Sequence, residues 1–103
     1  MKSMQNKEEE SMKFELGQLV MTRGIADAME SNEVFKTEVN QAFEKYANCD
    51  WGDTCKEDAA MNDEAIKTGD DRVLAVYQTS EGKIYIITEW DRSCTTILFP
   101  SEY

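Results

Sequence analysis

The sequence predicts an α+β domain in which an antiparallel sheet of three to four strands is packed on one face by two or three helices. Two observations support this prediction. Apolar residues recur at helical spacing in the first half of the chain, and the period changes to that of strands after Asp70 and Asp71. A chain of 103 residues is also the size of one domain with a single modest core.

The first 15 residues are polar and include the run Glu8-Glu9-Glu10. They carry too few apolar side chains to offset the entropy lost when a chain becomes ordered. We therefore expect a flexible polar arm over residues 1–15 and one folded domain over residues 16–103.

The domain is expected to begin with a short strand within residues 14–21, where apolar side chains alternate. Thr22 can cap a brief helix that ends near Met29, because a threonine hydroxyl accepts from free amides at a helix start. Ser31 or Asn32 can cap a second helix in the same way.

The second helix is the clearest element of the sequence. Its apolar residues recur at spacings of four, four and three, at Phe35, Val39, Phe43 and Tyr46. This spacing places them on one face of a helix, and we expect that face to pack on the sheet.

A third helix, rich in acidic residues, is expected to start at Asp53 as its N-cap and to run to Lys67, with Gly69 as a left-handed C-cap. Its apolar residues are few. They form only a thin core edge, made of Met61, Ala65 and Ile66.

The last third of the chain predicts strands. Residues 73–79 and 83–89 are rich in β-branched and aromatic residues and flank the turn Ser80-Glu81-Gly82, which predicts a hairpin. A further strand over residues 94–99 is stopped by Pro100.

The composition excludes several function classes. The chain has 21 acidic and 11 basic residues, a formal net charge of −10 and a pI near 4.4, whereas proteins that bind phosphates need clustered Lys and Arg. We therefore expect no direct DNA binding. The sequence shows neither a membrane-spanning apolar stretch nor a secretory signal, so we expect a cytoplasmic protein with no membrane partner.

The chain contains no histidine, which excludes Ser-His-Asp, Cys-His and histidine-based metal sites. Its three cysteines, Cys49, Cys55 and Cys94, are one ligand short of a zinc site and are predicted to be thiols. We therefore expect no catalytic residue, no cofactor and no metal ion.

The acidic charge is concentrated in residues 44–71, which carry nine acids and three bases. Three interpretations are open: a solvated helix face, a carboxylate site for Mg²⁺ that cleaves phosphodiesters, and a mimic of nucleic-acid phosphates. A single helical row of carboxylates is too sparse to copy a duplex, but two rows, or one row with the flanking loops, approach its charge density. The candidate partner-binding residues are Asp50, Trp51, Asp53, Glu57, Asp58, Asp63, Glu64, Asp70 and Asp71.

Trp51 in the turn before the acidic helix has two interpretations. An exposed tryptophan anchors protein interfaces, and a buried one would fold over the core beside Tyr46, which its usual burial favours. The same alternatives hold for the segment Trp90-Asp91-Arg92.

Three stretches carry a family resemblance: FELGQLVMTRGIADAM over residues 14–29, CDWGD with the later NDEAI over residues 49–66, and IYIITEWDRSCTTILFPSEY over residues 84–103. They resemble small proteins found on phages, plasmids and conjugative elements of Firmicutes. Some members of that group are similar to anti-CRISPR proteins, the inhibitors of type II-A Cas9 effectors.

The resemblance implies a non-catalytic inhibitor that binds Cas9 or its complex with guide RNA. Because Cas9-type nucleases hold nucleic acid in positively charged channels, an acidic surface would compete with guide RNA or target DNA. Two alternatives stay open: an accessory or regulatory protein of a mobile element that does not contact Cas9, and a metal-dependent nuclease that acts on guide RNA.

Overall fold

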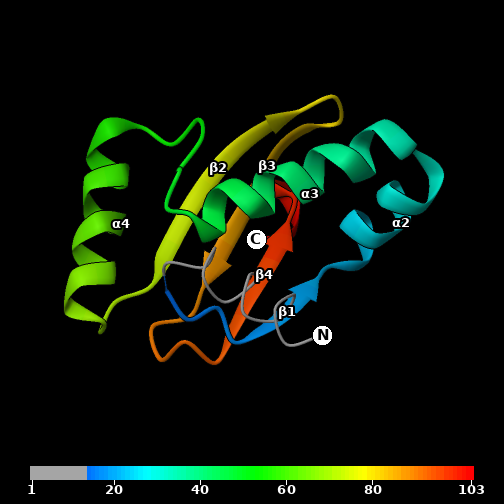
Figure 1. Cartoon of the computed structure of the whole chain (residues 1–103). Helices are drawn as coiled ribbons and strands as arrows, with labels where there is room; N and C mark the ends of the chain where they lie inside the picture. Colours follow the sequence, from blue (N-terminus) through cyan, green and yellow to red (C-terminus); the bar gives the residue numbers. More distant parts are fainter. Residues whose placement is uncertain (1–13) are drawn as a thin grey trace, which may run out of the picture.

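The computed structural model describes residues 14–103 of the chain. Residues 14–103 have the predicted α+β fold, with three helices, a four-stranded sheet and a final 3-10 turn (Figure 1). In chain order the elements are β1 (Gln18–Met21), α2 (Arg23–Ser31), α3 (Glu33–Ala47), α4 (Lys56–Thr68), β2 (Val73–Thr79), β3 (Gly82–Thr88), β4 (Cys94–Leu98) and η1 (Pro100–Glu102).

The sheet has the strand order β1-β4-β3-β2. The predicted hairpin joins β2 to β3, and β4 follows antiparallel to β3, so these three strands form the expected meander. The added N-terminal strand β1 pairs parallel to β4, so the sheet is mostly antiparallel. Parallel strands need a long crossover, and here all three helices and the hairpin lie between the two strands.

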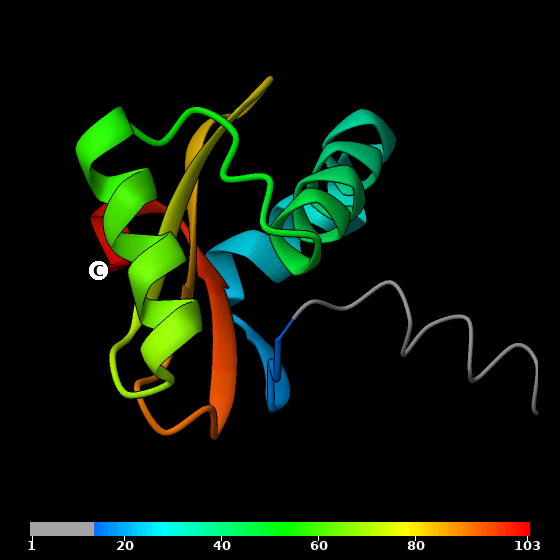
Figure 2. The same cartoon turned by 60° about the vertical axis from the view of Figure 1, so that its left-hand side comes forward.

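Helices α2 and α3 cover one face of the sheet, and α4 lies apart from them beside β2 (Figures 1 and 2). The buried face of α3 is the predicted one, with Phe35, Val39 and Tyr46 at most 1% exposed. Phe43 is only partly buried, and Ala42 takes the central position instead. At about 100° per residue, Phe43 lies roughly 60° from the centre of the stripe.

The predicted helix caps are mostly confirmed. Thr22 accepts from the amide of Ile25, and Asn32 caps α3 through the amides of Val34 and Phe35. Gly69 ends α4 in the left-handed conformation, with φ of 75°.

Three further expectations need correction. The N-cap of α4 is Cys55 rather than Asp53, whose carboxylate is used elsewhere. Met61 is 64% exposed and does not belong to the core edge. Phe14, expected in the arm, packs its ring against Tyr46 and Trp51, so the packed chain begins before residue 16. Residues 1–13 of the expected arm lie outside the described residues.

A chain of buried hydroxyl groups crosses the core. The Tyr46 hydroxyl lies 2.8 Å from that of Thr88, which lies 2.6 Å from that of Thr95. The Thr95 hydroxyl bonds the carbonyl oxygen of Leu16 at 2.6 Å. Because Thr88 and Thr95 are fully buried, this chain joins α3, two strands and the segment before β1 without contact to water.

Candidate functional site

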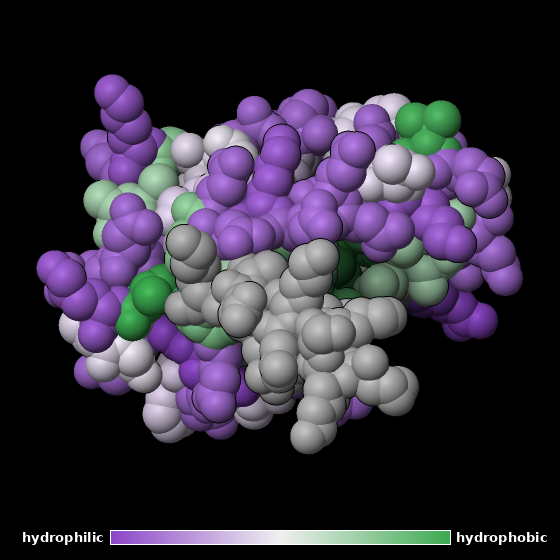
Figure 3. Space-filling model, in the orientation of Figure 1, coloured by the Kyte–Doolittle hydropathy of each residue, from purple (hydrophilic) through white to green (hydrophobic). Residues whose placement is uncertain are grey.

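The acidic surface consists of α4 and its two flanking loops, residues 50–71. This segment has eight acidic residues and two basic ones, and all eight acidic side chains are exposed. Hydrophilic side chains also cover most of the face that Figure 3 shows. Few apolar side chains of α4 pack on the domain. The polar contacts of this helix therefore determine how well the positions of its charges are fixed.

Asn62 attaches α4 to the edge of β2. Its side-chain amide donates to the carbonyl of Leu74 at 2.8 Å and accepts from the amide of the same residue at 3.2 Å. Asn62 is 4% exposed and Ala65 is 2% exposed, so both lie on the side of the helix that faces the strand. A side-chain amide thus takes the place of a neighbouring strand at this position.

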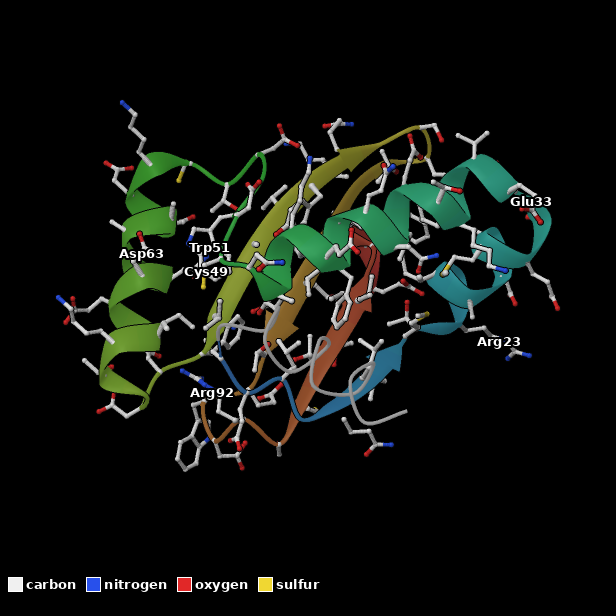
Figure 4. All side chains as sticks on the ribbon, in the orientation of Figure 1. Arg23, Glu33, Cys49, Trp51, Asp63 and Arg92 are labelled. Atoms are coloured by element: carbon white, nitrogen blue, oxygen red, sulfur yellow. The ribbon has the colours of Figure 1, made fainter. Side chains whose placement is uncertain are left out.

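Arg92 contacts the C-terminal part of α4. Its guanidinium donates to the carbonyl of Ala65 at 3.0 Å and to that of Asp71 at 2.7 Å (Figure 4). A cation at a helix C-terminus is favourable because the last carbonyls carry partial negative charge. The loop between β3 and β4 therefore fixes the position of the C-terminal part of α4 through these hydrogen bonds.

The acidic side chains of α4 point in three directions. Glu57 and Glu64, seven residues apart, lie on the outward side of the helix, opposite Asn62. Asp58 borders a small pocket of about 150 Å³ beside Asp71 and Arg72. Asp63 lies on the side of the helix that faces Trp51. The carboxylates are therefore spread around α4 and do not form a single row.

Trp51 is a core residue. The residue is 7% exposed, and its ring packs edge to face on Tyr46, with ring centroids 5.5 Å apart. Its indole N–H donates to Asp63 Oδ1 at 2.9 Å, and Figure 4 shows the two side chains pointing toward one another. This agrees with the interpretation of Trp51 as a residue that folds over the core, and it leaves the ring unavailable as an exposed anchor.

The loop before α4 continues the sheet beyond β2. The amide of Asp53 donates to the carbonyl of Val76 at 2.9 Å, and Asp53 Oδ2 accepts from the amide of Gln78 at 2.9 Å. The Thr54 hydroxyl accepts from the amide of Val76 at 2.8 Å. Together with Asn62, these groups pair the outward backbone of β2.

Asp50 and Gly52 shape the same loop. Asp50 Oδ1 accepts from the amide of Gly52, and its carbonyl accepts from the Tyr77 hydroxyl at 2.7 Å. Gly52 has φ of 62°, and a Cβ there would collide with the ring of Tyr77. A groove of about 380 Å³ runs beside this loop, lined among others by Asp50, Asp53 and Lys45.

The loop after α4 carries the last two acids. Asp70 accepts from the Thr68 hydroxyl, and the Asp71 carboxylate accepts from the amide of Arg72, both at 2.8 Å. Because these contacts are local, one side of each carboxylate stays available to solvent or to a partner.

Burial raises the pKa of Tyr46 and of Tyr77 far above the ordinary tyrosine value. Both side chains therefore stay protonated at neutral pH. They can form hydrogen bonds through their hydroxyl groups, but they do not act as general bases.

Within residues 14–103, no three His, Cys, Asp or Glu side chains come together in a way that could hold a metal ion. In the same part of the chain, no helix combines the length and the apolar content that crossing a membrane requires.

Comparisons with known proteins add no relative: no family model, no curated protein and no solved structure matches the chain.

Sequence reasoning missed two residues that position the acidic helix. Asn62 had a signal, since it lies on the same side of the helix as Ala65 and Ile66, where an amide needs a partner. For Arg92, the sequence of the helix contained no such signal, because Arg92 and its partner Ala65 are 27 residues apart in the chain.

Proposed function

We propose that this protein is an anti-CRISPR protein that inhibits a type II-A Cas9 effector. In this proposal the acidic surface of residues 50–71 binds Cas9, or Cas9 with its guide RNA, and competes with guide RNA or target DNA. The protein would act without catalysis, in the cytoplasm of a bacterial host cell. The observation that carries the proposal is the concentration of eight exposed carboxylates on one helix and its loops.

The spacing of these charges supports a phosphate mimic. The 13 residues of α4 span about 20 Å, a length over which one DNA strand carries about six phosphates. α4 itself carries four carboxylates, which is fewer, and its two flanking loops add four more. Helix and loops together approach the charge density of a nucleic-acid strand, which favours a positively charged channel for nucleic acid as the binding surface.

The attachment of α4 also supports the proposal. Asn62 and Arg92 fix the helix at its middle and its end, so the charges are held in place before a partner binds. Charges placed in advance lose less entropy on binding than charges on a flexible segment. The nuclease alternative lacks comparable support, because it needs metal ligands that converge on one point, and no three His, Cys, Asp or Glu side chains of residues 14–103 do so.

The test is a cleavage assay with purified Cas9, guide RNA, target DNA and this protein. Inhibition is expected when the protein and Cas9 are present in equal amounts. It is also expected when the protein has been treated with EDTA before the assay, because the proposed inhibitor needs no metal ion. Adding the protein before the guide and after it separates competition for guide loading from competition for target DNA. Full Cas9 activity at a large excess of the protein would contradict the proposal and favour a mobile-element protein without Cas9 contact.

Two triple variants locate the interface. Reversal of Glu57, Asp58 and Glu64 to Lys is expected to raise the half-inhibitory concentration at least about tenfold, a change of about 1.4 kcal/mol. Reversal of Glu8, Glu9 and Glu10 to Lys changes the net charge equally and is expected to leave inhibition nearly intact. Equal losses in both variants would mean that only net charge matters. Guide RNA shortened by substoichiometric protein with Mg²⁺ would establish the nuclease alternative instead.

A further inference from the structure

We infer that the outer edge of β1 binds an extended, basic segment of a partner protein as an additional strand of the sheet. This inference does not depend on the proposed function and concerns the side of the sheet away from α4. It rests on an open strand edge, on an apolar groove beside it and on the charge around that groove.

The open edge follows from the pairing of β1. The amides of Gln18 and Thr22 donate to the carbonyls of Ser93 and Ile97, which places the even-numbered residues of β1 toward β4. The amides and carbonyls of Leu19 and Met21 therefore point away from the sheet. Within residues 14–103, β1 is the end of the sheet and no other strand pairs with it.

β1 carries neither a charged residue nor a proline, which are two of the features that prevent strand pairing at natural edges. Its four residues are Gln-Leu-Val-Met. Leu19 is 42% exposed and Val20 is 38% exposed. An uncharged edge with exposed apolar side chains is a surface for strand addition.

A groove of about 330 Å³ lies beside this edge, between β1 and α2. Its apolar lining comes from Met21, Ala26 and Met29. A residue of an added strand opposite Met21 would point its side chain to the same face of the sheet and so into this groove. Backbone bonds would thus give affinity, and the groove would select an apolar side chain.

Charge selects the rest of the segment. Asp27, Glu30 and Lys36 also line the groove, so its acidic residues outnumber its basic one. The whole chain carries a formal charge of −10, which opposes pairing with a second copy. A four-residue edge also buries much less than the roughly 1,200 Å² that a stable dimer needs. The occupant is therefore an extended segment with Lys or Arg around an apolar residue.

The test uses a capped peptide in which Lys alternates with Val and Leu over seven residues, added to the full chain. Amide hydrogen exchange is the readout. The peptide is expected to slow exchange at Leu19 and Met21, with little change at Gln18 and Thr22, whose amides already bond β4. A peptide of the same sequence with every backbone amide N-methylated keeps the charge and is expected not to bind.

Two variants test the site. Leu19→Pro removes one outward amide and is expected to weaken peptide binding at least tenfold, whereas Leu19→Ala keeps the amide and is expected to bind normally. If Leu19→Pro does not fold, Ala26→Trp fills the groove from an exposed position of α2 and is expected to give the same loss.

Three results would overturn the inference. Equal binding of the N-methylated peptide would mean that charge alone attracts it. Slow exchange of Leu19 and Met21 in the free protein at every concentration would mean that the chain already covers its own edge. Protection that rises with protein concentration, together with a dimer mass, would identify a second copy as the occupant.

Discussion

The two edges of the sheet differ in how their backbone groups are paired. At β2, Asn62, Thr54 and Asp53 provide donors and acceptors for three successive outward positions of the strand. At β1, the outward groups of Leu19 and Met21 meet no strand within the described residues 14–103. One edge is therefore closed to strand addition by polar side chains, and the other is not.

This difference assigns a second role to the acidic helix. If α4 served only to carry charge, a helix with no buried polar residue would be sufficient. Instead Asn62 is buried and bonds both backbone groups of Leu74, so α4 covers a strand edge that would otherwise promote aggregation. Charge display and edge protection are thus combined in one element.

The largest effect is expected where β1 is seated against β4. Gly17 has φ of 66°, and a Cβ there would lie 2.5 Å from the carbonyl of Ser93 and close to that of Arg92. Gly17→Ala is expected to cost about 3 kcal/mol or more, because backbone must separate and a left-handed alanine is strained. Chemical denaturation measures the free energy of unfolding.

Gly69→Ala is the matched control for that prediction. Gly69 has φ of 75°, but a Cβ there would meet no atom of the described residues 14–103 within 4 Å. Only the conformational cost of about 1 kcal/mol is expected. If both variants lost the same stability, the close approach of Gly17 to the loop before β4 would have no energetic weight.

A smaller effect is expected when the closed edge is opened. Asn62→Leu removes both hydrogen bonds to Leu74 and is expected to cost about 2 kcal/mol. It should also speed amide hydrogen exchange at Leu74, whose outward N–H loses the Asn62 oxygen as its acceptor. Denaturation and hydrogen exchange measure the two effects. Asn40→Leu makes the same change at an exposed position of α3, where a change within about 0.5 kcal/mol is expected.

The smallest effect is expected at Glu102, near the end of β1. Its carboxylate accepts from the Thr22 hydroxyl and from the amides of Phe99 and Gly24, and these bonds lower its pKa below the ordinary value of 4.5. The stabilisation is complete above the unfolded pKa and is lost as pH falls through the folded one. At pH 7, the Glu102→Gln variant should unfold at a lower denaturant concentration than the wild type. The difference between the two denaturation midpoints should become smaller in acid. A constant difference from pH 7 to pH 3 would contradict this role of the charge.

The sequence predicted the elements that depend on local patterns. The stripe of Phe35, Val39 and Tyr46, the caps at Thr22 and Gly69, and the hairpin all follow from spacing and residue type. Each of these signals lies within one helix, one helix end or one pair of neighbouring strands. Such short-range rules do not depend on the rest of the fold.

The sequence did not predict features that depend on distant partners. The parallel pairing of β1 requires knowing where β4 returns, and the role of Asp53 at Gln78 requires knowing that the loop runs along β2. Within the candidate site, the exposure of the eight acids was predictable from their type. The burial of Trp51 beside Tyr46 was favoured by its residue type, whereas its hydrogen bond to Asp63 depends on how the helix docks.

The buried hydroxyl chain ends on a backbone carbonyl at both sides. Thr95 donates to the carbonyl of Leu16, and Tyr46 also donates to the carbonyl of Val73 at 3.2 Å. Three hydroxyl protons therefore serve four contacts, and Thr88 can donate either to Tyr46 or to Thr95. Loss of Thr95 would leave the Leu16 oxygen without this donor, whereas the Thr88 proton could still go to Tyr46. The middle hydroxyl thus gives the core a polar contact that adapts to the loss of one neighbour.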